Sequence, residues 1–175
     1  MKLIRCISGG QWGSDIAGLA AAHDLGIPTG GVAPKGWKTI YGPNPLLKNL
    51  GLVESHSSSY RIRTFENVKI SDGTMRFAND FKSPGEICTL NAIKIFKKPH
   101  LDFNLNKDLL FDDPEHWLYN VDTALEWLND YGIKIINIAG NAGKDKMVSR
   151  HIFIVVRKFL KVVFSKYNSG GYDAY

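Results

Sequence analysis

The fold is decided by residues 7–15, Ile7-Ser8-Gly9-Gly10-Gln11-Trp12-Gly13-Ser14-Asp15. This stretch ends a short apolar run that begins at Leu3, and it precedes an alanine- and leucine-rich segment, 15–25, that stops at Gly26. An apolar run that ends in glycines before such a segment is typical of a buried parallel strand turning into a helix. The stretch therefore predicts the first strand, turn and helix of an α/β domain.

Two properties of this turn predict that it binds an anion. Glycine lets the backbone approach a ligand closely, and the first N–H groups of a helix have no internal partner and carry the positive end of its dipole. We expect a phosphate against the backbone of Gly9, Gly10 and Gly13, at the carboxyl edge of the sheet. A plain tight turn, capped by a Ser or Asp side chain, is the alternative.

The same alternation continues along the chain. We expect strands at 27–32, 73–78, 100–105 and 133–139, and helices at 57–69, 84–98, 114–131 and 146–166, whereas 34–51, with three prolines and three glycines, predicts a long ordered loop. This order predicts a Rossmann-like α/β fold, with a mainly parallel sheet and helices on both faces. Ile4, Cys6, Ile135 and Ile138 should be buried in central strands.

Length and composition indicate one globular domain, 1–167, followed by a flexible tail, 168–175. The 175 residues are 44% hydrophobic and 22% charged, with a net charge of +5. The basic residues are dispersed, so an anionic small ligand is a better expectation than nucleic acid. Neither cysteine belongs to a zinc-ligand pattern, so no metal site is expected. The apolar runs predict neither a signal peptide nor a membrane span, so a cytoplasmic protein is expected.

Three further turns carry polar residues. Asp72, in Ser71-Asp72-Gly73-Thr74, could cap the turn or contact a ribose hydroxyl. Glu86, in Ser83-Pro84-Gly85-Glu86, could be a catalytic carboxylate or a residue that suits the helix dipole. Lys144 follows Gly140 and Asn141 and could reach a phosphate or face solvent. Arg61 and Arg63 suit phosphate, but two residues apart on a helix they cannot both face the same way.

These motifs together resemble the circularly permuted YpsA-like branch of the SLOG superfamily, also called the "putative molybdenum carrier" family. The resemblance covers about residues 4–160 and rests on stretches in one order: Ile7-Ser8-Gly9-Gly10-Gln11, Leu25-Gly26-Ile27-Pro28, Pro34-Lys35-Gly36, Tyr60-Arg61, Ser71-Asp72-Gly73-Thr74 and Asn137-Ile138-Ala139-Gly140. It implies a Rossmann-like sheet, a nucleotide or nucleotide-derived ligand over the glycine turns, and a homodimer.

The chain departs from the family pattern at several positions. Trp12 stands where the family has Thr, Ile16 where it has Arg, and Ala20 where it has Asp; Ser83-Pro84-Gly85-Glu86 replaces Ser-Gly-Gly-Thr. Pro84 removes an N–H donor, so the phosphate pocket is expected to be reshaped, and Trp12 could stack on a base or plug the site.

The resulting hypothesis is binding of a nucleotide or nucleotide derivative by a sensor, a sequestering protein or a carrier. The alternatives are a phosphoribohydrolase-like enzyme that cleaves an N-glycosidic bond, and a carrier of molybdate or, by the family label alone, of molybdenum cofactor; no other cofactor is expected. The candidate catalytic residues are Glu86 and Asp72. The candidate ligand-binding residues are Ser8, Gly9, Gly10, Gln11, Trp12, Gly13, Asp15, Lys35, Gly36, Arg61, Asp72, Gly73, Thr74, Ser83, Gly85, Gly140, Asn141 and Lys144.

Overall fold

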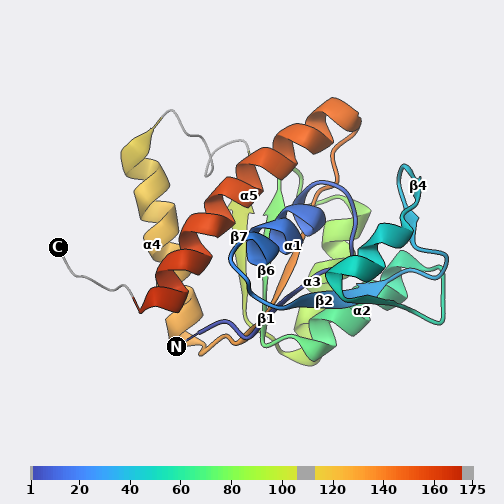
Figure 1. The fold of residues 1–175 in the computed structure, drawn as a ribbon, viewed down its shortest axis with the longest axis horizontal. Helices are drawn as coiled ribbons and strands as arrows, with labels where there is room; N and C mark the ends of the chain where they lie inside the picture. Colours follow the sequence, from blue (N-terminus) through green and yellow to red (C-terminus); the bar gives the residue numbers. More distant parts are fainter. Residues whose placement is uncertain (1, 106–112, 171–175) are drawn as a thin grey trace.

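The computed structural model describes residues 2–105 and 113–170, and in it six parallel strands form the central sheet. The strand order is β5-β2-β1-β8-β6-β7 (Figure 1). The strands are β1 (Arg5–Ile7), β2 (Thr29–Ala33), β5 (Leu52–Glu54), β6 (Gly73–Ala78), β7 (His100–Asn104) and β8 (Ile135–Gly140). Every neighbouring pair is parallel. The predicted Rossmann-like α/β fold with a parallel sheet is confirmed.

Helices cover both faces of this sheet. On one face, α1 (Ser14–Asp24), α4 (Pro114–Asp130) and α5 (Lys146–Ser169) pack together over the main core. On the other face, α2 (Tyr60–Ile70) and α3 (Pro84–Phe96) pack on each other around a small cluster of Val68, Ala92 and Ile93. Figure 1 shows α1 and α5 crossing the same face of the sheet.

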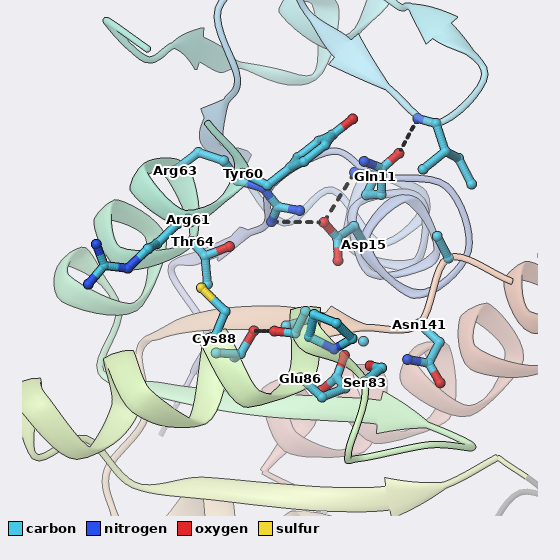
Figure 2. Close-up of a pocket in the computed structure, with 17 residues that line it drawn as sticks. Gln11, Asp15, Tyr60, Arg61, Arg63, Thr64, Ser83, Glu86, Cys88 and Asn141 are labelled. Atoms are coloured by element: carbon cyan, nitrogen blue, oxygen red, sulfur yellow. Dashed lines mark hydrogen bonds and ion pairs between the residues drawn. The ribbon is translucent and has the colours of Figure 1, made fainter. Parts of the chain in front are cut away.

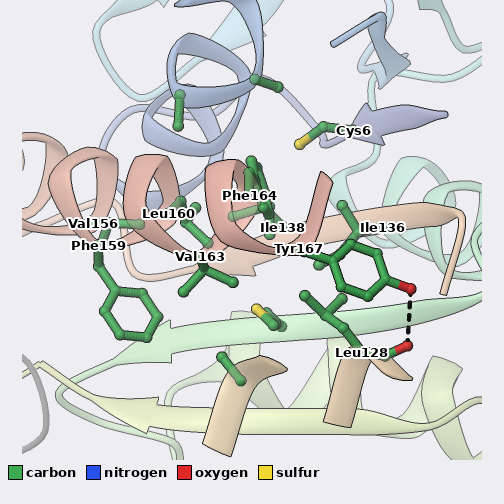
Figure 3. Close-up of a cluster of buried hydrophobic side chains, with 14 of the residues drawn as sticks. Cys6, Leu128, Ile136, Ile138, Val156, Phe159, Leu160, Val163, Phe164 and Tyr167 are labelled. Atoms are coloured by element: carbon green, nitrogen blue, oxygen red, sulfur yellow. Dashed lines mark hydrogen bonds between the residues drawn. The ribbon is translucent and has the colours of Figure 1, made fainter. Parts of the chain in front are cut away.

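The main core is built on the apolar face of α5 (Figure 3). Buried residues on this helix recur every three or four positions from Ile152 to Tyr167, which places them on one side of an α-helix. The ring of Phe159 meets Phe77 and Phe103 from the strands and Trp117 from α4. Trp117 is partly buried against this core, and Trp127 is only 8% exposed.

The strand order places the last strand, β8, beside the first strand, β1. β8 lies between β1 and β6, with Cys6 opposite Ile136. From this centre, β1, β2 and β5 follow one another toward one edge of the sheet, and β6 and β7 toward the other. Such a change of direction creates a crevice above the carboxyl ends of the central strands, which is where open α/β folds bind ligands.

The structure differs locally from the expectations for the buried strand residues and for the loop 34–51. Ile4 precedes β1 and is 56% exposed, whereas Cys6 and Ile138 are fully buried and Ile135 is half-buried. The expected loop 34–51 contains a small hairpin, β3 (Lys38–Thr39) with β4 (Gly42–Pro43), and a 3₁₀ helix, η1 (Pro45–Leu50), and β5 follows it.

The expected tail is in part the end of α5. This helix continues to Ser169, and Gly170 ends it in a left-handed conformation. The side chain of Asn168 accepts a hydrogen bond from the backbone N–H of Leu3 at 2.8 Å. Residues 171–175 of the expected tail lie outside the described part of the chain.

Candidate functional site

The glycine turn after β1 holds an anion, and that anion belongs to the chain itself. The Asp15 carboxylate accepts hydrogen bonds from the backbone N–H groups of Gln11, at 3.1 Å, and Gly9. The Gly10 N–H donates to Oγ of Ser8 at 3.2 Å. Two of the three N–H groups that the sequence assigned to a phosphate, those of Gly9 and Gly10, thus already have internal acceptors. The expected position of a phosphate on Gly9 and Gly10 is corrected accordingly.

The two glycines are needed for packing in this turn. A Cβ on Gly9 would lie 1.8 Å from Nη1 of Arg63. Gly10 has a φ of +71°, and a Cβ there would lie 2.8 Å from Cδ1 of Leu47 in η1. Glycine at these positions lets the guanidinium of Arg63 and the 3₁₀ helix approach the backbone, whether or not a ligand binds.

Arg63 from α2 completes the environment of Asp15. Its Nη1 lies 3.3 Å from Oδ2 of Asp15, and the two side chains are 13% and 3% exposed. Burial raises the pKa of Asp15, and the nearby Arg63 charge and the Gln11 and Gly9 N–H groups oppose that rise. The pair ties the first turn of α1 to the first turn of α2.

A cavity of about 550 Å³ opens beside this pair (Figure 2). It lies above the carboxyl ends of the central strands, among the first turns of α1, α2 and α3 and the residues after β8. Its volume is within the range of about 300–1,000 Å³ that small-molecule sites occupy. The lining residues are Gln11, Asp15, Ile40, Tyr60, Arg61, Arg63, Thr64, Ser83, Pro84, Gly85, Glu86, Cys88, Thr89, Ala139, Gly140, Asn141 and Ala142.

Glu86 borders the cavity on the side opposite Asp15 (Figure 2). It is 3% exposed, and its Oε2 lies 3.5 Å from Nη1 of Arg76, a buried arginine of β6. The Arg76 guanidinium also donates to the backbone oxygen of Glu86 and to both carboxylate oxygens of Asp102 in β7. Burial raises the pKa of Glu86 to about 7; Arg76 opposes this, and Asp15 and Asp102 add to it. A carboxyl group that titrates near neutral pH can bind or release a proton under physiological conditions.

Comparisons with known proteins place the chain in a family. The circularly permutated YpsA SLOG family matches residues 6–161. The chain belongs to this family. A crystal structure described as "putative molybdenum carrier protein" from Syntrophus aciditrophicus is similar, with a TM-score of 0.73 and 32% identity over 93% of this chain and 94% of the other. A search of curated proteins found no match.

The structure of this SLOG-family chain gathers eight of the predicted site residues around the cavity. They come from four turns or helix starts that are far apart in sequence and share the carboxyl edge of the sheet. They are Gln11, Asp15, Arg61, Ser83, Gly85, Glu86, Gly140 and Asn141. Ser8 lies buried nearby, where its Oγ lies 3.2 Å from the backbone oxygen of Asp15.

The turn 71–74 lies at the opposite edge of the sheet. Oδ2 of Asp72 accepts hydrogen bonds from the backbone N–H groups of Lys134, at 2.9 Å, and Ile135, at 2.7 Å. Gly73 starts β6, and Thr74 is buried and pairs with Asn137 of β8. Asp72, Gly73 and Thr74 are therefore away from the cavity, because a turn that precedes a parallel strand lies at the amino edge.

Other predicted residues also lie outside the cavity lining. Trp12 is 40% exposed and packs its ring against Tyr41, so it neither lines nor plugs the cavity. The Gly36 N–H donates to Glu54 at 2.6 Å, and Lys35 and Lys144 are exposed. Gly13 has a φ of +81° and packs against the backbone of 141–142.

Sequence reasoning did not select two of the charged groups of this region. Arg63 was considered beside Arg61, and the structure points it at Asp15, while the guanidinium of Arg61 stacks over Phe65 at 4.9 Å and points outward (Figure 2). Arg76 could have been noticed as an arginine inside an otherwise apolar strand, because a buried arginine needs acidic partners.

Within 2–105 and 113–170, no group of three or more His, Cys, Asp or Glu side chains could hold a metal ion. No helix in this part of the chain is long and apolar enough to cross a membrane.

Proposed function

We propose that this protein binds a phosphate-bearing small molecule, a nucleotide or a nucleotide derivative, and acts as its carrier or sensor. The observation that carries the proposal is the 550 Å³ cavity above the central strands, with arginines and helix N-termini at its border. Ligands of open α/β sheets bind at this position. The carrier role is also in keeping with the printed name of the similar structure from Syntrophus aciditrophicus.

The phosphate is assigned to the start of α3 and to Arg61. The side chain of Ser83, the N-cap of α3, makes no capping hydrogen bond, and Pro84 occupies the first turn. A Cβ on Gly85 would meet nothing within 4 Å, so the backbone there faces open space. An anion at this helix end would gain from the unpaired N–H groups and the dipole. Arg61 lines the same cavity, and its guanidinium, which stacks over Phe65 and points outward without a ligand, would turn toward the start of α3 to meet the phosphate.

Calorimetric titration tests this assignment. We expect nucleoside monophosphates to bind more tightly than the matching nucleosides, because only the former carry the anion. Arg61→Gln should weaken nucleotide binding by about tenfold or more, since hydrogen bonds to charged groups contribute about 1.5–3 kcal/mol, and should leave nucleoside binding unchanged. Lys69→Gln, which removes an exposed charge from the last turn of the same helix, is the matched control. Equal loss in both variants would contradict the assignment.

A phosphoribohydrolase-like activity is a second candidate, and the position of Glu86 favours it. A buried carboxyl group that borders the cavity, with a pKa of about 7, suits general acid or base chemistry. The same nucleotides, incubated with the protein and separated by chromatography, would release free base and ribose 5-phosphate if the protein is such an enzyme. Molybdate and a pterin belong in the same binding panel, as probes of a molybdenum carrier.

A further inference from the structure

The charges under and beside the cavity do not balance. Two guanidinium groups, Arg63 and Arg76, face three carboxyl groups, Asp15, Glu86 and Asp102. Arg63 pairs with Asp15, and Arg76 engages both oxygens of Asp102. Glu86 is left with a single contact of 3.5 Å to an arginine that is already engaged. The cluster therefore holds one carboxyl group more than its arginines neutralise.

The surplus group has an oxygen without a hydrogen-bond partner. Oε2 of Glu86, the atom that lies 3.5 Å from Nη1 of Arg76, is buried and makes no hydrogen bond within the described part of the chain. A buried polar atom of this kind requires an explanation, because leaving it unpaired destabilises the protein. Glu86 lines the cavity, so a bound molecule could provide the missing partner.

Two other features show that the position of Glu86 is fixed. The backbone oxygen of Glu86 accepts a hydrogen bond from Nη1 of Arg76 at 3.1 Å. Nε of Arg76 in turn donates to Oδ1 of Asp102 at 2.8 Å. Asp102 thus positions Arg76, and Arg76 positions both the backbone and the side chain of Glu86. Side chains that bind a ligand are typically held in place in this way by the residues behind them.

We propose that Glu86 determines the ligand specificity of the cavity by accepting hydrogen bonds from a donor group of the ligand. The inference rests on the proposed function: the ligand carries a phosphate, assigned to Arg61 and the start of α3, and a donor-bearing part that reaches Glu86. Sugar hydroxyls and the N–H groups of a base both have the required chemistry. A ligand without the donor would leave the carboxylate unpaired, so the cavity discriminates against it.

Protonation of Glu86 competes with this contact. The charged groups that face Glu86 are Arg76 from β6, Asp102 from β7, Asp15 from α1 and Arg63 from α2. Burial is the largest influence and holds the pKa near 7. The protonated form has lost the negative charge that accepts the hydrogen bonds, so donor-bearing ligands should bind more weakly as the pH falls from 8 to 6. Binding at neutral pH should release a proton.

Matched pairs of nucleotides test the proposal by calorimetry at pH 8. Guanosine and inosine monophosphates differ only in the 2-amino group, and a ribonucleotide and its 2′,3′-dideoxy analogue differ only in the hydroxyls. We expect the wild-type protein to prefer the donor-bearing member of one pair by about tenfold or more. The pair that shows the preference identifies whether base or sugar meets Glu86.

The variant Glu86→Gln keeps the shape and removes the charge. It should reduce the preference to about twofold or less and abolish the dependence of that preference on pH, since both members of a pair carry the same phosphate. Glu126→Gln, at an exposed position of α4, is the control and should retain both. Should Glu86→Gln fail to fold, the difference in proton release between the two members of a pair on binding to the wild-type protein, measured in buffers of different ionisation enthalpy, provides an independent readout, because the phosphate is common to both.

The outcomes separate this inference from the proposed function. Nucleotide binding with no preference within either pair, and with equal proton release by both members, would overturn the role of Glu86 and leave the proposed function standing. A preference that persists in Glu86→Gln would also overturn it. If no nucleotide binds at all, both the proposed function and the inference fail.

Discussion

Asp15 and Arg63 illustrate how a single ion pair can replace an expected ligand. The carboxylate occupies the N–H groups of the glycine turn, and the guanidinium from α2 compensates its charge. Their side chains are 3% and 13% exposed, so removal of one partner leaves the other charge with little solvent to stabilise it.

We expect Asp15→Ala to lower the free energy of unfolding by about 3 kcal/mol, because breaking a buried pair from one side costs about 3–5 kcal/mol. Arg63→Met, which keeps the length of the side chain, should restore part of this loss in the double variant. Urea denaturation of the two single variants and the double variant measures the coupling. Additive effects, within about 0.5 kcal/mol, would show that the two residues act independently.

Glu86 gives a second prediction, on the dependence of stability on pH. Its pKa rises from 4.5 to about 7 in the folded protein, so the folded state holds a proton that the unfolded state has already lost. This contribution to stability is complete below about pH 4.5 and is lost as the pH rises through 7. Glu86→Gln has no such proton, and its stability relative to wild type should increase between pH 5 and pH 8.

The increase is at most about 3 kcal/mol, since one pKa unit corresponds to about 1.4 kcal/mol. Urea denaturation at several pH values measures it, with Glu126→Gln expected to follow the wild type. A Glu86→Gln curve parallel to that of the wild type would mean that Glu86 titrates in the folded protein as it does in the unfolded chain.

At the scale of elements, apolar periodicity identified the inner strands and the five long helices. β6 was predicted with its observed bounds, 73–78, because the turn Ser71-Asp72-Gly73 marks its start. β5 escaped prediction because it is a short edge strand in which Val53 and Glu54 are exposed. The expected ligand contact of Asp72 was wrong, because its turn precedes β6 and therefore lies at the amino edge of the parallel sheet, away from the cavity.

The last turn of α5 was also misjudged, and Tyr167 provides the test. Its Oη lies 3.0 Å from the backbone oxygen of Ile133 and 3.2 Å from that of Leu128, which joins this turn to the end of α4 and the start of β8. Tyr167→Phe should lower the free energy of unfolding by about 1–2 kcal/mol, because it removes the hydroxyl donor from the backbone oxygen of Ile133, whereas that of Leu128 keeps the hydrogen bond from the Ile133 N–H. Tyr119→Phe, at a site that is 67% exposed on α4, is the control. An equal effect of both substitutions would refute an anchoring role for the hydroxyl.

At the scale of the whole molecule, parallel strands explain why the site could be predicted only in part. Each turn after a strand reaches the same edge, so the gathering of residues 11–15, 83–89 and 139–142 follows from strand order alone. The pairing of Asp15 with Arg63 joins residues 48 positions apart, and no local pattern indicates it. The sequence therefore located the edge but not the internal carboxylate that fills the glycine turn.

The assembly state is a further prediction for the whole molecule. We expect a homodimer, with a mass by light scattering about twice the 19.5 kDa of the chain. The apolar side chains available to a partner include Ile87 and Ile95 of α3, which are 47% and 62% exposed. Ile95→Glu should shift the mass toward the monomer. A wild-type monomer at micromolar concentration would contradict the prediction.

Ligand binding should stabilise the whole fold, because the cavity is built from segments that meet only when the sheet is complete. A nucleotide at about 100 times its dissociation constant adds about 2.7 kcal/mol to the free energy of unfolding. For a chain of this length, each kcal/mol raises the melting temperature by about 2–4 °C, so a shift of about 5–10 °C is expected. Thermal melts with and without nucleoside monophosphates measure it.

Two variants make this last prediction specific to the cavity. Without nucleotide, Arg61→Gln should melt at the wild-type temperature, because the Arg61 side chain stacks on Phe65 at the border of the cavity and makes no buried ion pair. When nucleotide is added, the melting temperature of this variant should change little. Lys69→Gln should shift as the wild type does. A full shift in Arg61→Gln would place the phosphate away from α3. A wild-type protein that shifts with molybdate or a pterin and not with nucleotides would assign the cavity to a different anionic ligand.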